Sequence, residues 1–254
     1  MLLSDELRNK ACNKIRNGVS INKISKELHL GKSTIYYYYK KIKGKKFVEP
    51  EFKLGNSRLE GEINGIFAGD GSQYYDKKRG HYEVNVHFGV KNYCYAIYVK
   101  RLFENYFHKT FRLNWDSDTQ IRIRTQSRKI FNYFQNYLSY DCHIKHCTVK
   151  LKDHCSSAFK TGFLKGMFDT DGCLKVVAKE NRTRIFYSTT SEQLAFQIGD
   201  ILNELSMKNK VYTIDRSRRG EKTIFLVNVW KESTNRFIKT IKPFKAQRAD
   251  NSVR

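Results

Sequence analysis

The spacing of hydrophobic residues divides the chain into two kinds of segment. Residues 1–46 carry apolar side chains every three or four positions, as in Leu7, Ala11 and Ile15. This period is typical of amphipathic helices that bury one face. We therefore predict a small all-α domain over residues 1–46, followed by a linker over residues 47–57.

From there onward, stretches with a helical period alternate with stretches of period two. Tyr82, Val84 and Val86 alternate with polar residues, which is the pattern of a strand with one buried face. The order helix, strand, strand, helix, strand, strand, helix occurs in residues 58–152 and again in residues 153–254. Antiparallel strands of this kind form sheets with one face covered and one face solvated. The predicted fold class is α+β, with two similar halves after the all-α domain.

A nine-residue stretch occurs twice, at the start of each predicted half. INGIFAGDG ends at Gly71, LKGMFDTDG ends at Gly172, and Asp171 follows Asp70 by 101 residues. A repeat at this spacing indicates two copies of one supersecondary unit of about a hundred residues. Each stretch has a helical pattern, and we expect Gly71 and Gly172 to end these helices in the left-handed conformation.

Small residues form a stripe along both motif helices, at positions i, i+4 and i+8. Glycine costs roughly 1 kcal/mol in a helix interior, so the stripe indicates that another helix backbone approaches closely. The simplest partner for each helix is the other copy, which would place Asp70 beside Asp171. The stripe consists of Gly61, Gly65 and Gly69 in the first copy and of Gly162, Gly166 and Thr170 in the second.

Two aspartates at adjacent helix C-termini would be unfavourable without a partner. The negative end of the helix dipole and the repulsion between the carboxylates both oppose their ionisation. Bound cations would offset both effects, and carboxylate and carbonyl oxygens are the ligands that Mg²⁺ prefers. The alternative is that each Asp-Gly pair forms only a turn.

The charge of the chain indicates a polyanionic partner. There are 48 Lys and Arg residues against 25 Asp and Glu residues, a formal net charge of +23 over 254 residues. Nucleic acid is the first candidate partner and an anionic membrane the second. The sequence has no long apolar run and no signal-peptide pattern, which argues against the membrane. Six scattered cysteines are expected to be reduced thiols, so we expect a reducing compartment such as the cytoplasm or nucleoid, with an organelle genome also open.

The first domain has features of a DNA-binding module. The stretch NGVSINKISKELHLGKSTIYYYYKK resembles the helix-turn-helix of resolvases and repressors, although His29 stands where such motifs often carry Gly. The resemblance implies that residues 32–41 form a recognition helix in a major groove. A helical packing domain with a solvated basic face is the alternative. The candidate DNA contacts are Lys32, Ser33, Thr34, Tyr36, Tyr37 and Lys40.

Arginines are also expected on the solvated faces of the two sheets. Two such sheets beside a central helix pair would form a basic saddle for duplex DNA. Any single arginine has the alternative role of a solvated charge without a partner. The candidates are Arg122, Arg124, Arg182, Arg184 and Arg216.

Residues 58–245 resemble the LAGLIDADG homing endonucleases of the single-chain type with two motifs. FLKGMFDTDG is a close match to the motif, and EINGIFAGDG is a good match in which Ala68 stands at an often acidic position. The segments IRIRTQSRKIFNYFQNYL and STTSEQLAFQIGDILNEL also resemble strand-to-helix passages of that family. The resemblance implies two αββαββα halves related by pseudo-twofold symmetry. It also implies a monomeric enzyme that hydrolyses one phosphodiester in each DNA strand with a divalent metal, Mg²⁺ or Mn²⁺.

The resemblance assigns roles to several residues. By motif position, Asp70 and Asp171 are the metal-binding aspartates, and the carbonyl groups of Gly69 and Thr170 are further ligands. Such a site also needs polar or basic groups that orient water and stabilise the phosphate. The candidates from the sequence are Lys231 and Gln126, with Lys175 as a third, and each has the alternative role of a solvated side chain. Asp169 lies inside its helix and is interpreted as structural.

Three functions remain in competition at this stage. The first is a site-specific endonuclease, and the intact aspartate pair favours it over the second, a DNA-binding regulator without catalysis. The third is a maturase that binds intron RNA.

Cys142, His146 and Cys155 belong to a Cys- and His-rich segment whose residue types suit zinc. Its spacing matches no common zinc pattern, so a plain connector is the simpler interpretation.

Overall fold

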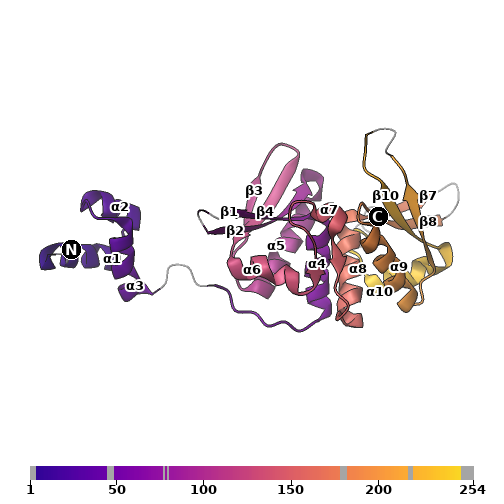
Figure 1. Ribbon diagram of the computed structural model, residues 1–254, viewed down its shortest axis with the longest axis horizontal. Helices are drawn as coiled ribbons and strands as arrows, with labels where there is room; N and C mark the ends of the chain where they lie inside the picture. The colour runs from indigo at the N-terminus through magenta and orange to yellow at the C-terminus, as the bar shows by residue number, and fades with distance from the viewer. Residues whose placement is uncertain are drawn as a thin grey trace, which may run out of the picture. The chain divides into compact units, whose positions relative to one another are not determined.

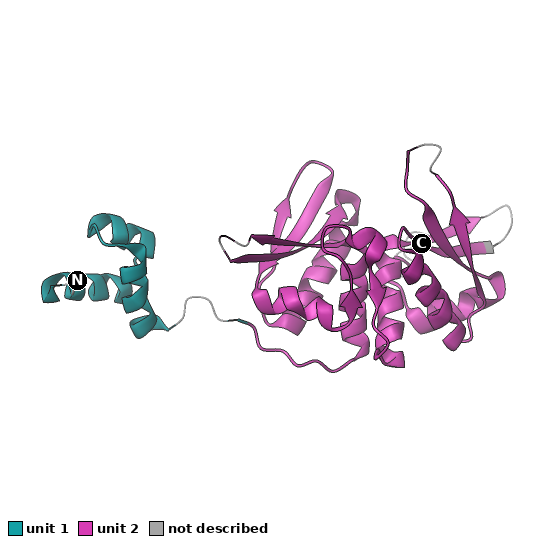
Figure 2. Ribbon diagram, in the orientation of Figure 1, with its two compact units in different colours: residues 1–49 teal, residues 50–254 magenta. Residues whose placement is uncertain are grey.

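The computed structural model describes residues 4–44, 49–76, 78, 80–177, 182–216 and 220–246. The chain divides into two compact units, residues 1–49 and residues 50–254 (Figure 2). Among the described residues, no helix combines the length and apolar character that crossing a bilayer requires. All six cysteines are free thiols.

The first unit is a cluster of three helices around a small core. The helices are α1 (Asp5–Arg16), α2 (Ile21–Glu27) and α3 (Lys32–Lys43). Ser20 caps α2 by accepting a hydrogen bond from the backbone of Lys23. His29 adopts the left-handed conformation, with φ of 50°, in the turn between α2 and α3. A non-glycine residue can therefore occupy this turn. The core consists of Ala11, Ile15, Ile24 and Ile35.

The second unit contains two halves with the same order of elements (Figure 1). The first half has α4 (Arg58–Asp70), β1 (Gly71–Asp76), β2 (His81–Gly89), α5 (Tyr93–Phe107), β3 (Arg112–Trp115), β4 (Gln120–Gln126) and α6 (Arg128–Tyr133). The second half has α8 (Ser157–Asp171), β7 (Gly172–Val177), β8 (Arg182–Thr189), α9 (Glu192–Glu204), β9 (Asn209–Ile214), β10 (Ile224–Val229) and α10 (Thr234–Ile241). The predicted α+β class and the order of the elements are confirmed.

A short connector joins the halves. It contains β5 (Leu138–Ser139), α7 (Lys145–Thr148) and β6 (Lys150–Leu151), and β5 pairs with β6. This connector carries the Cys- and His-rich segment. It also carries Lys145, whose place in the site is described below.

Each half has an antiparallel four-stranded sheet. The strand orders are β1-β2-β4-β3 and β7-β8-β10-β9, so the two sheets have the same topology. Alternate residues such as Val86 and Ile123, or Tyr187 and Val227, are fully buried against the helices. The intervening residues lie on the opposite face of each sheet, here called the outer face, because side chains alternate along a strand.

The helices α4 and α8 lie side by side between the two halves (Figure 1). Glycines allow their backbones to touch. A methyl group on Gly65 would stand 2.3 Å from the carbonyl oxygen of Phe163, and one on Gly166 would stand 2.3 Å from that of Glu62. The small-residue stripe therefore has the predicted cause, close approach of the other motif helix.

The conformation predicted for Gly71 and Gly172 is wrong. Their φ angles are −80° and −82°, and both residues begin a strand in extended conformation. Glycine is required here for space. A Cβ on Gly71 would lie 2.4 Å from the ring of Phe67, and one on Gly172 would lie 2.3 Å from the ring of Phe168. The chain turns directly from helix to strand over an aromatic ring of its own helix.

Candidate active site at the ends of the paired helices

The two motif aspartates meet at the C-terminal ends of α4 and α8. Asp70 and Asp171 are the last residues of these helices. Gly69 packs against the other motif, because a Cβ there would lie 2.2 Å from the hydroxyl of Thr170 and 3.1 Å from a carboxylate oxygen of Asp171. The structure thus brings together Asp70, Asp171, Gly69 and Thr170, the four residues that the sequence suggests as metal ligands.

The environment of this pair opposes ionisation. Burial, and secondly the charge of Asp171, raise the pKa of Asp70 to about 7. Burial also raises the pKa of Asp171. Among the described residues, neither carboxylate makes a hydrogen bond or an ion pair. Two partly buried carboxylates are therefore held close together without a hydrogen-bond donor from the described part of the protein, as a cation site requires.

Two lysines that sequence reasoning missed flank the pair. Lys145 donates from Nζ to the carbonyl oxygens of Phe67, Ala68 and Gly69, at 2.8, 2.5 and 3.2 Å. Burial lowers the pKa of Lys145 to about 8, although Asp171 and Asp70 both favour its charged form. A cation at the end of α4 also complements the negative end of the helix dipole.

Lys245 contacts the end of α8 and the start of β7. Its Nζ donates to the carbonyl oxygens of Thr170 and Gly172, at 2.9 and 2.6 Å. Burial lowers its pKa as well. A signal for both lysines exists in the sequence, because Lys145 follows Asp70 by 75 residues and Lys245 follows Asp171 by 74. Without the fold, however, this near-equal spacing does not single out two residues among the 48 Lys and Arg of the chain.

Asp169 holds the backbone of Lys245 in place. One of its carboxylate oxygens accepts a hydrogen bond from the Lys245 backbone N–H at 3.1 Å. Its other oxygen lies 3.4 Å from Nζ of Lys165, which in turn contacts Glu62. The structural role expected of Asp169 is thus also a positioning role, because the chain segment that it anchors carries a lysine of the site.

The structure does not bring Lys231 or Gln126 to the aspartates. On β8, Tyr187 pairs with Gly172 beside Asp171, whereas Ile185 pairs with Val229, two residues before Lys231. Lys231 therefore follows the opposite end of the sheet, where it begins a short 3-10 helix, Lys231–Ser233. Lys231 follows β10 and Gln126 ends β4, and both strands run away from the aspartates, so the role suggested for these two residues at the site is wrong.

Gln126 likewise lies away from the motif aspartate of its half, Asp70. It pairs with Glu83, whereas Val86 pairs with Gly71 next to Asp70. Lys175 is exposed and lies on the outer face opposite Arg184. The cations that lower the pKa of Asp70 are Lys145 and Lys245.

The candidate DNA contacts lie on accessible surfaces of the two units. On α3, Lys32, Ser33, Tyr37 and Lys40 are exposed, and Thr34 and Tyr36 are half-buried, around the buried Ile35. Each of these side chains can therefore reach a partner from one helix.

On the sheets, the arginines differ in their surroundings. Arg122 donates to Asp116 at 3.0 Å, Arg124 lies 3.8 Å from Glu83, and Arg216 donates to Glu221 at 3.0 Å. Arg184 is exposed on the outer face of the second sheet. Arg182 is the first residue of β8, and its side chain lies outside the described part of the chain.

The Cys- and His-rich segment forms no metal cluster in the described part of the chain, where no group of three or more Cys, His, Asp or Glu side chains converges. His146 instead contacts Lys222, and its carbonyl oxygen accepts a hydrogen bond from Thr190 at 2.8 Å. The segment therefore links the connector to the second half.

The fold is that of the LAGLIDADG homing endonucleases. It combines two helices in close contact at glycines, two sheets of the same topology, and an aspartate at the end of each helix. Residues 158–242 match the family model of the LAGLIDADG-like domain. No curated protein matches the chain significantly.

Solved structures show the same fold. The homing endonuclease I-DmoI in complex with DNA and Mn has a TM-score of 0.53 at 20% identity, over 74% of this chain and 97% of that chain. A variant of I-DmoI with its target DNA in the presence of Mg has a TM-score of 0.54 at 19% identity, over 73% and 96%. The homing endonuclease I-WcaI bound to its DNA recognition sequence has a TM-score of 0.52 at 14% identity, over 76% and 84%.

Proposed function

We propose that this chain is a site-specific endonuclease that cuts both strands of duplex DNA with a divalent metal. The observation that carries the proposal is the pair of carboxylates, Asp70 and Asp171, held together without a protein donor and flanked by Lys145 and Lys245. The similar proteins of known structure include homing endonucleases bound to DNA with Mn or Mg, which supports the same chemistry here.

The donor set fits a hard divalent cation. Asp70 and Asp171 would supply carboxylate oxygens, which are ligands that Mg²⁺ and Mn²⁺ take. Gly69 and Thr170 would supply carbonyl oxygens, which accept hydrogen bonds from Lys145 and Lys245 in the structure described. A metal bound there would lower the pKa of a water molecule and neutralise charge on the phosphate. The unpaired state of the two carboxylates is the feature of this structure that supports such a site.

The chain's own lysines would complete the chemistry. An ammonium group beside each helix end can stabilise the negative charge that develops on a phosphate during hydrolysis. The pKa of Lys145, about 8, also lets this side chain hold or release a proton near neutral pH. Because Lys145 and Lys245 occupy matching places in the two halves, each would serve one strand of the DNA.

Binding would use both units. The outer faces of the sheets and the exposed side of α3 carry the candidate arginines, lysines and tyrosines, and the chain has a net charge of +23. The helix α3 would act as a recognition helix that extends the site. We further propose that the protein works as a monomer in a reducing compartment, in keeping with two motifs in one chain and six free cysteines.

The test is cleavage of a randomised duplex library with Mg²⁺, with capture and sequencing of the new ends. Asp70→Asn and Asp171→Asn proteins are the matched controls, because they keep the shape of the side chains. Recurrent staggered ends from the unaltered protein alone would support the proposal. Tight binding to selected duplexes without any new ends would favour a regulator. Preference for intron RNA over those duplexes would favour a maturase.

A further inference from the structure

The outer faces of the two sheets share one backbone register. In the first half, Asn85 pairs with Ser72 and Arg124. In the second half, Phe186 pairs with Cys173 and Asn228. Ser72 and Cys173 are each the second residue after a motif aspartate. Asn85 and Phe186 therefore occupy equivalent positions on the two faces.

The same comparison extends along the strands. Arg122 pairs with Asn114, and the equivalent Leu226 pairs with Tyr212. Gln126 and Trp230 each follow an equivalent buried residue of β4 and β10. At four equivalent positions, a polar residue of the first half is thus replaced by an apolar or aromatic residue in the second. The pairs are Asn85 and Phe186, Arg122 and Leu226, Asn114 and Tyr212, and Gln126 and Trp230.

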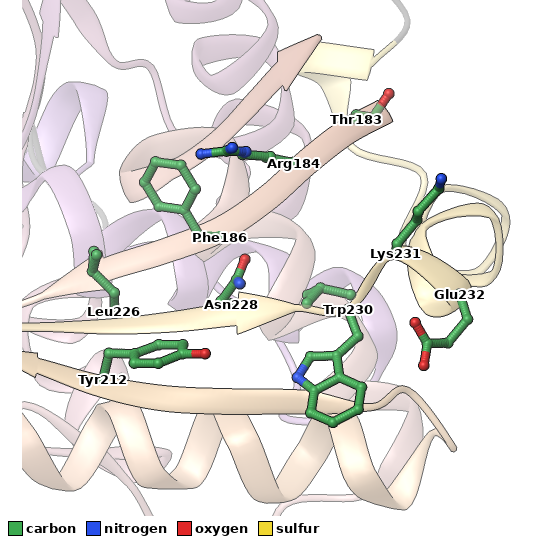
Figure 3. Close-up of a pocket in the computed structure, with 10 residues that line it drawn as sticks. Thr183, Arg184, Phe186, Tyr212, Leu226, Asn228, Trp230, Lys231 and Glu232 are labelled. Carbon is green, nitrogen blue, oxygen red and sulfur yellow. The ribbon is translucent and has the colours of Figure 1, made fainter. Parts of the chain in front are cut away.

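The apolar side chains of the second half line one hollow. Phe186, Leu226, Tyr212 and Trp230 line a pocket of about 480 Å³ on the outer face (Figure 3). Tyr212 is 44% exposed and Trp230 is 43% exposed. Large side chains left in water in this way indicate a partner with apolar groups of its own.

The first half carries polar side chains at the equivalent positions instead. Asn85 is buried, and Asn114 and Arg122 are partly exposed. Among the described residues, the side-chain oxygens of Asn85 and Asn114 and Nε of Arg122 are buried atoms without a hydrogen-bond partner. The partly exposed amide of Asn114 and guanidinium of Arg122 are the groups that can donate a hydrogen bond to a ligand on this face. The two faces are therefore suited to different contacts with one ligand.

Charge and position favour duplex DNA as that ligand. Arg184 and Lys231 line the same pocket as the apolar side chains, and Nζ of Lys210 lies 5.3 Å from the ring centre of Tyr212. An apolar centre with a cationic rim suits a polyanion that also presents apolar groups. The face begins at Cys173, two residues after Asp171, so a duplex held at the aspartates would continue over it.

We propose that the second half recognises its half-site through thymine methyl groups, whereas the first half uses hydrogen bonds. Thymine is the one base that presents a methyl group in the major groove, and Phe and other apolar side chains contact it, whereas Arg pairs with guanine. Phe186, Leu226 and Tyr212 supply the apolar contacts. This inference rests on the proposed function, because it requires that the ligand is duplex DNA.

The experiment replaces thymine by uracil, which removes only the methyl group. Duplexes are first selected from a random library by the full-length protein without divalent metal, so that cleavage is not needed. Each thymine of the selected site is then replaced singly, and binding is measured by fluorescence anisotropy. We expect each contacted uracil in one half-site to weaken binding about fourfold, from the burial of one methyl group, and replacements in the other half-site to have no effect.

Two matched variants assign the effect to the second sheet. Leu226→Ala should bring the ratio of thymine to uracil affinity close to one at the positions that Leu226 contacts. Arg122→Ala, the equivalent change in the first sheet, should weaken binding and leave that ratio unchanged. Thermal unfolding of both variants checks that the sheets stay folded.

The outcomes separate this inference from the proposed function. Uracil without effect in both half-sites would overturn the inference while leaving the endonuclease proposal intact. Failure to select any duplex would overturn the proposed function itself. Tighter binding to a thymine-rich single strand than to the duplex would also overturn the inference, because it would mean that the aromatic side chains stack on unpaired bases.

Discussion

Gly61 in α4 and Gly162 in α8 make the same contact in opposite directions. A methyl group on Gly61 would stand 1.9 Å from the carbonyl oxygen of Phe159, and a methyl group on Gly162 would stand 1.9 Å from that of Arg58. The distance between the helices, and with it the distance between Asp70 and Asp171, depends on both glycines.

We predict that Gly61→Ala destabilises the protein by about 3 kcal/mol or more, because backbone atoms must move to admit the methyl group. Urea unfolding measures the free energy. Gly89→Ala is the control, since a methyl group there meets nothing within 4 Å. Equal stabilities of the two variants would contradict this account of the helix seam.

Each lysine should serve one strand. Lys145→Met is expected to slow cleavage of one strand by roughly 10²- to 10³-fold, the usual effect of removing one group that stabilises a transition state, and Lys245→Met should slow cleavage of the other. Gels with separately labelled strands show which strand is cut. The control is Lys239→Met, an exposed lysine on α10. If both variants slow the two strands equally, the assignment of one lysine to each strand is wrong.

Asp169 is predicted to position Lys245. Asp169→Ala removes the acceptor of the Lys245 N–H, so cleavage should fall on the same strand as in Lys245→Met. Asp169→Asn keeps an oxygen acceptor and should restore a large part of the rate. A purely structural role would lower the melting temperature and slow both strands together, so strand-resolved rates and thermal unfolding distinguish the two roles.

Stability without metal should fall as the pH rises. The pKa of Asp70 in the folded chain is raised from 3.8 to about 7. Its neutral form therefore contributes stability that is fully present below about pH 4 and is lost as the pH rises through about 7. We expect Asp70→Asn to be more stable than the unaltered protein at about pH 8, by roughly 2 to 4 kcal/mol, and equally stable at about pH 4. Identical pH profiles of the two proteins in urea unfolding would refute the prediction.

Contacts of α3 with DNA phosphates should appear in the salt dependence of binding. Lys32→Ala and Lys40→Ala are each expected to weaken binding and to reduce the slope of log K against log salt by about 1. Lys10→Ala is the control in the same unit, because Lys10 pairs with Glu6 at 2.6 Å on α1. No change of slope in either α3 variant would remove this helix from the interface.

Much of this architecture could be read from the sequence because it rests on repetition. The two Asp-Gly motifs and the glycine stripe predicted the helix pair, and the periods of two and of three to four predicted the element order. These signals are local in the sequence, and each of them occurs in both halves, so the pattern of one half supports the interpretation of the other. The meeting of Asp70 and Asp171 follows from them.

The lysines could not be placed in the same way. Lys231 follows the last strand of its half, but strand register decides at which end of the sheet that strand stops, and register depends on pairing across the chain. Lys145 and Lys245 reach the site from segments with no regular pattern. The need for glycine at position 71 has a related cause, since the ring of Phe67 excludes a side chain there only once the helix and the strand are packed.

The common register of the two sheets means that the protein can change its target one half at a time. A substitution in the contact between α4 and α8 affects both halves, because each glycine fits against the backbone of the other helix. A substitution on an outer face alters one half-site alone. Redesign of this chain for a new DNA sequence should therefore keep the contact between α4 and α8 unchanged. It should exchange outer-face residues in one sheet and leave the other sheet as it is.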